Sequence, residues 1–303
     1  MKKQLAGQIY PASITPFDSQ NRIHASALRS LFDLNLRQGA PGFFIGGSSG
    51  ECFLMSESER LTLFEIAAEY KDRAILFAHV GAISTDQAIL YARRARDLRY
   101  DAIAATPPYY YGFDARAICQ YYYDIAQAAG MPVLIYNFPG NTGKEFDLGN
   151  PHYQELFRSG AILGVKHTNQ VVYQLERIKH LNPNLLVFDG YDETMSAGLI
   201  LGADGAIGST FNFMYPHYRK LYDAFLARDW EETKRLQIKA NNIMEALVRV
   251  GLFPAIKYIL TRMGIDVGLP RRPFLPLSDE DKLYVNRILR ENLENEPAQN
   301  ISL

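Results

Sequence analysis

A lysine at the end of an apolar run is the most reactive feature of this sequence. The run 162–165 leads directly into Lys166. Burial lowers the pKa of an amine, and a partly deprotonated amine can attack a ketone to form a Schiff base. The alternative is a lysine whose ammonium group reaches solvent above the strand. Lys257 is a rival nucleophile, but it lies in a segment expected to be helical, where we expect its long side chain to extend to the surface.

A tyrosine lies near the end of the preceding apolar run, 133–137. Tyr136 is therefore expected one strand away from Lys166, at the same level. A phenol and an amine that face one cavity can divide proton transfer and imine formation between them. The alternative is an amphipathic tyrosine at the rim, with no chemical role.

A glycine- and serine-rich segment, 46–51, follows another apolar run and contains Ser48 and Ser49. Small residues let the backbone approach a ligand, and successive amides beside two hydroxyls form a donor cluster suited to a small anion such as a carboxylate. The alternative is a segment that only turns the chain. It lacks the Gly-Lys-Ser/Thr of a Walker loop.

Acidic and hydroxyl residues follow the last two apolar runs, 185–189 and 206–208. Asp192, Glu193 and Ser209 could bind the vicinal hydroxyls of a sugar or a metal ion, or the carboxylates could cap the next helix, and these alternatives stay open. A metal site is not expected, because the six histidines and two cysteines show no ligand spacing.

Eight short apolar segments must position these residues, and segments with helical periodicity separate them. The predicted strands are 8–14, 42–46, 74–80, 102–105, 133–137, 162–166, 185–189 and 206–208. The predicted helices are 25–38, 57–70, 85–98, 115–129, 150–158, 171–180, 193–201 and 216–227, with caps at Ser56, Ser84 and Asp114. This α/β alternation predicts a (β/α)8 TIM barrel, with a doubly wound open sheet as the alternative. In a barrel, the residues at the carboxyl ends of the strands form the catalytic face.

The alternation ends near residue 228. Three further helices are predicted at 230–250, 253–263 and 279–291, with no strand between them. We therefore predict a catalytic barrel over 1–227 and a C-terminal helical extension over 228–303, with a frayed tail from Asn295.

Composition limits the partners of the chain. Of 303 residues, 48% are apolar, and 32 Lys plus Arg balance 33 Asp plus Glu, so no charge excess favours nucleic acid. No apolar run approaches the roughly 18 residues of a spanning helix, and the N-terminus lacks the apolar core of a signal peptide. We expect a cytoplasmic protein that does not bind a membrane.

Six motifs in this order resemble the N-acetylneuraminate lyase branch of the pyruvate-dependent class I aldolases, a family that includes dihydrodipicolinate synthase. They lie at 46–51, 106–110, 136–139, 164–168, 190–193 and 208–212. The resemblance implies a (β/α)8 barrel with a C-terminal helical extension, a homotetramer, and no metal or organic cofactor.

The resemblance also implies a role for each site residue. Lys166 would be the Schiff-base nucleophile and Tyr136 the acid/base. Ser48 would link Tyr136 to the substrate carboxylate and to Tyr109, which in this family reaches across a subunit interface, and Ser49 would help to hold the pyruvyl carboxylate. The residues implied to hold the hydroxylated chain of a sugar acid are Thr168, Gly190, Asp192, Glu193 and Ser209.

One position favours the sialic acid branch. Asn141 stands where dihydrodipicolinate synthases have an arginine for a second carboxylate, and an amide cannot form that bidentate ion pair. The expected reaction is reversible aldol cleavage of N-acetylneuraminate to N-acetylmannosamine and pyruvate. The alternatives are a related pyruvate-dependent enzyme, either a 2-keto-3-deoxy sugar acid aldolase or a dihydrodipicolinate synthase, and a non-catalytic barrel that binds sialic acid or pyruvate. No role is assigned to His167.

Overall fold

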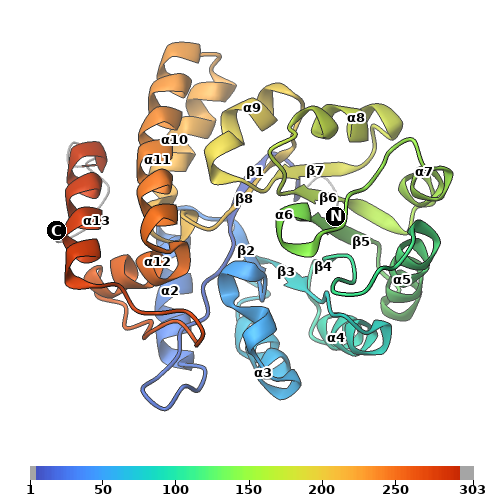
Figure 1. Ribbon diagram of the computed structural model, residues 1–303, viewed down its shortest axis with the longest axis horizontal. Coiled ribbons are helices and arrows are strands. Elements are labelled where there is room, and N and C mark those ends of the chain that lie inside the picture. The colour runs from blue at the N-terminus through green and yellow to red at the C-terminus, as the bar shows by residue number, and fades with distance from the viewer. Residues whose placement is uncertain (1–4, 294–303) are drawn as a thin grey trace.

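The computed structural model describes residues 5–293, and the frayed tail predicted from Asn295 lies outside these residues. Eight parallel strands form one sheet, hydrogen-bonded in the order β1-β8-β7-β6-β5-β4-β3-β2 and curled into a barrel (Figure 1). The strands are β1 (Gln8–Pro11), β2 (Gly42–Ile45), β3 (Ile75–His79), β4 (Ala102–Ala105), β5 (Val133–Asn137), β6 (Ile162–His167), β7 (Leu186–Asp189) and β8 (Gly205–Gly208).

The barrel closes between β1 and β2 through a single parallel bridge. Ala12 pairs with Phe44, and the Ser13 amide donates to the Phe44 carbonyl at 2.9 Å. This closure confirms the predicted (β/α)8 barrel and excludes the doubly wound open sheet.

Helices cover the outside of the barrel (Figure 1). They are α2 (Ala25–Arg37), α3 (Glu57–Ala68), α4 (Thr85–Asp97), α5 (Ala115–Ala129), the short α6 (Pro139–Thr142), α7 (Pro151–Arg158), α8 (Tyr173–Leu181), α9 (Met195–Ile200) and α10 (Phe211–Leu226). In α5, Ile118, Tyr121, Tyr122 and Ile125 are buried at the i, i+3, i+4, i+7 spacing of an amphipathic helix.

Side chains fill the interior of the barrel. Tyr10, Phe77 and Phe188 meet edge to face there, with ring centroids 5.0 to 5.9 Å apart. Neighbours in sequence such as Leu76 and Val187 belong to the core between sheet and helices instead. Because alternate residues of each strand point inward, only every second side chain at a strand end can face the cavity above the interior.

The helix ends test the predicted caps. Ser56 forms the predicted capping box with Glu59, and the Asp114 side chain accepts from the Ala117 amide at 2.8 Å. Ser84 is wrong as a side-chain cap, because it makes no capping hydrogen bond to α4.

Helix α10 begins at Phe211, five residues before the predicted start. Pro216 lies inside this helix rather than in its first turn, and Met214 has non-helical angles of φ −127° and ψ 35°. The proline lacks an amide donor, so the helix kinks and continues instead of starting there.

A register shift determines which residues of β5 and β6 lie opposite each other. Val133 lies opposite Ile162 but Leu134 lies opposite Gly164, so β6 has one extra residue and Tyr136 becomes the partner of Lys166. Gly164 has a steric reason to be glycine, because a Cβ there would lie 1.8 Å from the Leu186 carbonyl oxygen.

Three helices follow the barrel without an intervening strand: α11 (Trp230–Val250), α12 (Leu252–Arg262) and α13 (Asp279–Leu293). Helix α11 packs against α10 on one side and α13 on the other, and Figure 1 shows the group beside the barrel. Within residues 5–293, every helix is too short or too polar to cross a membrane.

Candidate active site

A cavity of about 70 Å³ lies at the carboxyl ends of the strands. Seven of the predicted site residues line it: Ser48, Ser49, Tyr136, Lys166, Gly190, Asp192 and Ser209. Thr168 contacts Lys166, whereas Tyr109 and Glu193 do not line the cavity. The structure thus brings together residues from the ends of β2, β5, β6, β7 and β8.

Lys166 projects into the barrel and is only 3% exposed, so the alternative of an ammonium group in solvent is wrong. Its Nζ donates to Thr168 Oγ1 at 3.1 Å and lies 3.9 Å from the centroid of the Tyr136 ring. Desolvation lowers the pKa of Lys166 to about 7, and the negative charges of Asp192 and Asp189 offset part of that effect. Near neutral pH, a large share of this amine is therefore unprotonated and nucleophilic.

Tyr136 faces the same cavity, and its hydroxyl donates to Ser48 Oγ at 3.3 Å. Burial raises the pKa of Tyr136 well above its usual value, although the contact with Ser48 opposes the change. The free protein therefore presents a protonated phenol beside the lysine, which suits a proton donor at the first step of imine chemistry.

The segment predicted to bind a carboxylate contains a tight 3-10 turn, Ser48–Gly50. A glycine before the turn and one at its end allow close packing: a Cβ on Gly47 would lie 2.7 Å from the Phe44 ring, and one on Gly50 would lie 3.0 Å from Thr15 Oγ1. The turn is thus pressed against the strands beneath it, with Ser48 and Ser49 directed at the cavity.

Asp192 joins two loops rather than capping a helix. Its carboxylate accepts the backbone amides of Ser209 and Thr210 at 3.1 and 2.7 Å and the Thr210 hydroxyl at 2.5 Å. The helix-capping alternative is therefore wrong for Asp192. Burial raises the pKa of Asp192, while the hydrogen bonds from Thr210 oppose that change.

The neighbouring carboxylate, Glu193, has no hydrogen-bond partner within the described residues for its buried Oε2 atom. Desolvation, followed by the charge of Asp192, raises the pKa of Glu193 to about 7. Its position beside the cavity lining leaves it available to a ligand that extends beyond Asp192.

Gly190 makes room for the partner of the nucleophile. A Cβ at this position would lie 2.0 Å from Thr168 Oγ1, the atom that accepts the hydrogen bond from Lys166. Glycine is therefore required here for packing as well as for the shape of the cavity.

His167, the residue after the nucleophile, has a positioning role in the described chain. The Asn137 side-chain amide lies 3.2 Å from Nδ1, which assigns the proton to Nε2, and Nε2 lies 3.1 Å from the Val171 carbonyl oxygen. Burial lowers the pKa of His167 to about 4, so the ring is neutral and fixes the loop after β6.

Tyr109 lies outside the cavity, with its ring packed edge-on against Phe53 at 4.9 Å. Desolvation raises the pKa of Tyr109 to about 12. A single chain does not bring this tyrosine to Ser48, and its predicted role stays a prediction.

The cavity lining also includes three residues of the C-terminal helices that the sequence did not reveal. Met244 from α11 and Leu252 and Phe253 from α12 form an apolar wall on the side of the C-terminal helices. Apolar residues in helices carry no chemical signal in the sequence.

The prediction that Lys257 extends to the surface is wrong. Its side chain is 1% exposed, and its Nζ pairs with Glu51 Oε1 at 2.6 Å.

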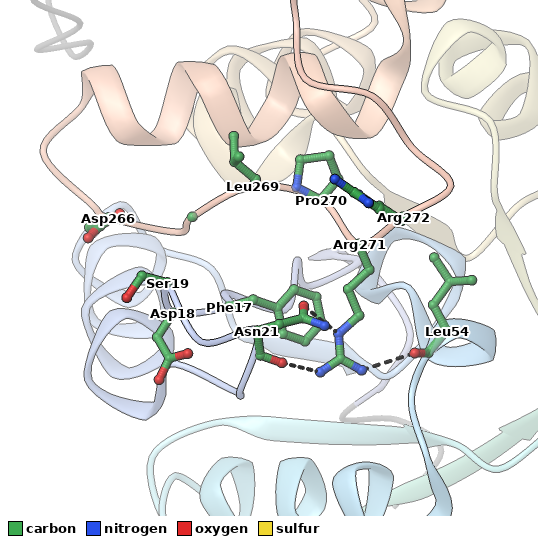
Figure 2. Close-up of a pocket in the computed structure, with 11 residues that line it drawn as sticks. Phe17, Asp18, Ser19, Asn21, Leu54, Asp266, Leu269, Pro270, Arg271 and Arg272 are labelled. Atoms are coloured by element: carbon green, nitrogen blue, oxygen red, sulfur yellow. Dashed lines mark hydrogen bonds between the residues drawn. The ribbon is translucent and has the colours of Figure 1, made fainter.

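A larger cavity, of about 760 Å³, lies between the segments 17–21 and 266–272 and contains none of the predicted site residues (Figure 2). Within residues 5–293, His, Cys, Asp and Glu side chains form no group of three able to hold a metal ion. The residues facing the smaller cavity are suited to covalent chemistry on a carbonyl compound with a carboxylate.

Comparisons with known proteins agree with this geometry. Residues 5–292 match the dihydrodipicolinate synthetase family. The chain is 40% identical to an N-acetylneuraminate lyase from Rhizobium meliloti, over 90% of this chain and 91% of that protein. It is similar to a solved Ruminococcus gnavus sialic acid aldolase (TM-score 0.91, 29% identity, covering 96% and 98% of the two chains). It is also similar to CdNal from Clostridium difficile, solved with mannosamine (TM-score 0.90, 35% identity, covering 94% and 99%).

Proposed function

The chain belongs to the dihydrodipicolinate synthetase family, and from that membership we propose that it cleaves N-acetylneuraminate reversibly to N-acetylmannosamine and pyruvate. It is a carbon–carbon lyase of the class I aldolase type. The observation that carries the proposal is the buried amine of Lys166, with its pKa near neutrality, beside the Tyr136 phenol and the turn with Ser48 and Ser49.

The first step forms the imine. The carboxylate of the open-chain sugar acid binds the hydroxyls and amides of Ser48 and Ser49, which places the C2 ketone beside Lys166. The unprotonated amine attacks C2, and the Tyr136 phenol gives its proton to the departing hydroxyl, which leaves as water. The product is a protonated imine on Lys166 next to a Tyr136 phenolate, and the positive charge of the imine stabilises that phenolate.

The second step breaks the carbon–carbon bond. The Tyr136 phenolate takes the proton of the C4 hydroxyl, the C3–C4 bond breaks, and its electron pair moves into the imine to form an enamine. N-acetylmannosamine leaves as the aldehyde. The enamine is then protonated at C3, and water hydrolyses the imine to release pyruvate and free Lys166. The lysine acts as the electron sink, so the proposed reaction uses no metal or organic cofactor.

The remaining predicted residues bind the hydroxylated chain. Thr168, Gly190, Asp192, Glu193 and Ser209 surround the part of the site beyond Lys166. Asn141 supports a substrate with one carboxylate, because an amide does not form the ion pair that a second carboxylate needs. This argues against dihydrodipicolinate synthase activity.

We also propose a homotetramer in the cytoplasm. Tyr110 and Tyr111, next to Tyr109, are 83% and 59% exposed and would be covered at a subunit interface, where Tyr109 would meet a neighbouring site. The buried thiols of Cys52 and Cys119 are free, as in proteins of reducing compartments.

The test measures pyruvate release from N-acetylneuraminate for the wild-type protein, for Lys166→Ala, and for Lys234→Ala, which removes an exposed lysine of α11, as a control. Borohydride trapping and peptide mapping identify the residue that forms the adduct. Release that disappears only in Lys166→Ala, with the adduct on Lys166, is the expected result. A pyruvate adduct on Lys166 without release from N-acetylneuraminate would reject the sugar substrate, and the absence of any adduct would reject the Schiff base.

A further inference from the structure

We propose that Lys257 and Arg271, in the C-terminal extension, are positioning residues that hold the Ser48–Gly50 turn through Glu51 and so set the affinity for the carboxylate of the keto acid. The inference rests on the proposed function, in which this turn binds that carboxylate. It assigns to the C-terminal helices a role in the reaction beyond lining the cavity.

Glu51 is connected directly to the turn. It follows Gly50, and its amide donates to the Ser48 carbonyl at 3.0 Å. Its backbone is left-handed, with φ 58°, a conformation that is uncommon for a residue with a side chain. The side chain is fully buried, at 0% exposure. The position of Glu51 therefore restrains the backbone of the residue that carries the Ser48 hydroxyl.

Both oxygens of the Glu51 carboxylate are held by the C-terminal extension. Lys257 Nζ, from α12, lies 2.6 Å from Oε1, and the Arg271 backbone amide donates to Oε2 at 2.7 Å. Lys257 Nζ also donates to the Leu269 carbonyl at 3.2 Å. Desolvation lowers the pKa of Lys257, and the charge of Glu51 opposes that change.

Arg271 fixes the other end of this cluster. Its guanidinium donates to the carbonyls of Asn21 and Leu54, at 2.7 and 2.9 Å (Figure 2), and forms an ion pair with Glu59 of α3. The Phe17 ring lies beneath both cations, 4.1 Å from Arg271 Cζ and 4.3 Å from Lys257 Nζ. The charges of Glu51, Glu59, Lys257 and Arg271 balance one another.

Stability alone does not account for this arrangement. Burying an ion pair costs so much desolvation that an apolar pair of similar volume is often as stable or more stable. The turn, in contrast, needs a restraint on its carboxyl end, because Gly47 precedes it, Gly50 ends it, and glycine leaves the backbone more freedom in the unbound chain than any other residue. A charged pair with fixed geometry supplies that restraint directly behind Ser48 and Ser49.

The test uses the condensation direction, in which pyruvate and N-acetylmannosamine are varied separately. Lys257→Met should raise the KM for pyruvate by at least about tenfold, because the carboxylate turn is displaced, and should leave the KM for N-acetylmannosamine unchanged. A loss of folded protein alone would lower the apparent kcat and change neither KM. Lys282→Met is the matched control, since it removes a lysine from a surface pair of the same extension, 2.8 Å from Asp279.

Lys257→Met leaves Glu51 buried without its cation, so this variant can fail to fold. The double variant Glu51→Gln/Lys257→Met removes both charges and should fold, with the KM for pyruvate still raised. A folded double variant with the wild-type KM for pyruvate, or an equal rise in both KM values, would overturn the proposal.

Failure of the proposed function would be recognised separately. If the wild-type protein does not condense the two substrates, the pyruvate concentration that gives half-maximal borohydride trapping on Lys166 replaces the KM. The same rise is expected in the double variant but not in Lys282→Met, and an unchanged value would overturn the positioning role.

Discussion

The protonation of Lys166 should control the rate over a defined pH range. With a pKa of about 7, the unprotonated fraction of this amine falls from about 97% at about pH 8.5 to about 3% at about pH 5.5, a decrease of about 30-fold. An amine with the ordinary value of 10.5 would lose about 1000-fold over the same range and would still be gaining reactivity at about pH 9.5. The two cases differ most clearly on the alkaline side.

The assay is the pH dependence of kcat/KM for pyruvate release, which reports the pKa of the essential groups in the free enzyme. We expect the logarithm to rise with unit slope up to about pH 7 and then to level off. A rate that still climbs about tenfold per pH unit between about pH 8 and pH 9.5 would refute the inferred burial effect on Lys166.

Asp189 could produce a limb of the pH profile at the same position, because desolvation raises its pKa to about 7. Its negative charge raises the pKa of Lys166, so Asp189→Asn should move the rising limb of the profile to lower pH. A limb that disappears in Asp189→Asn would instead assign the titration to this aspartate.

Three further substitutions test neighbouring parts of the site. Tyr136→Phe should lower kcat by about 100-fold or more and slow pyruvate trapping on Lys166, because the phenol acts in both the imine-forming and the cleavage step, and an unchanged kcat would contradict its placement in the proton steps. Gly190→Ala should lower kcat/KM by about tenfold or more, because the new Cβ displaces Thr168, and an unchanged rate would contradict the packing argument. Lys166→Met should abolish pyruvate release. It should also increase the free energy of unfolding by about 2 kcal/mol, which corresponds to a rise in Tm of roughly 4 °C. The folded pKa of Lys166 lies below its unfolded value, so wild-type stability rises between about pH 7 and 10.5, and calorimetry should show a smaller Tm gain at the alkaline end.

The strands could be predicted because each one is recognisable from its own short apolar sequence. Residues 133–137 and 162–167 are buried along their length, so each strand reads as a short apolar run between polar helices. The start of α10 was not predictable in the same way. Pro216 normally marks a first helical turn, and only the packing of the completed fold extends the helix through a kink to Phe211.

The parts of the site that could be predicted are those in which a residue with a reactive or polar side chain lies at the end of an apolar strand. Lys166 and Tyr136 stand out because a polar group interrupts an apolar run, and the barrel brings the ends of all strands to one face. The pairing of Glu51 with Lys257 joins residues that are far apart in the sequence, and it depends on how α12 packs, so no local sequence pattern predicts it. Asp192 looks like a helix cap in the sequence for the same reason, since its partners Ser209 and Thr210 lie in a distant segment that follows β8.

The extra residue in β6 has an effect that is confined to the place where it is inserted. Before it, Val133 and Ile162 lie opposite each other and both belong to the core between sheet and helices. After it, Ile135 and Val165 lie opposite each other and belong to that same core, so Tyr136 and Lys166 still share the interior side of the sheet. The register shift absorbs the added residue as a bulge. The reactive pair is therefore insulated from a change of strand length two residues before it, and the barrel can vary there in length without separating the amine from the phenol.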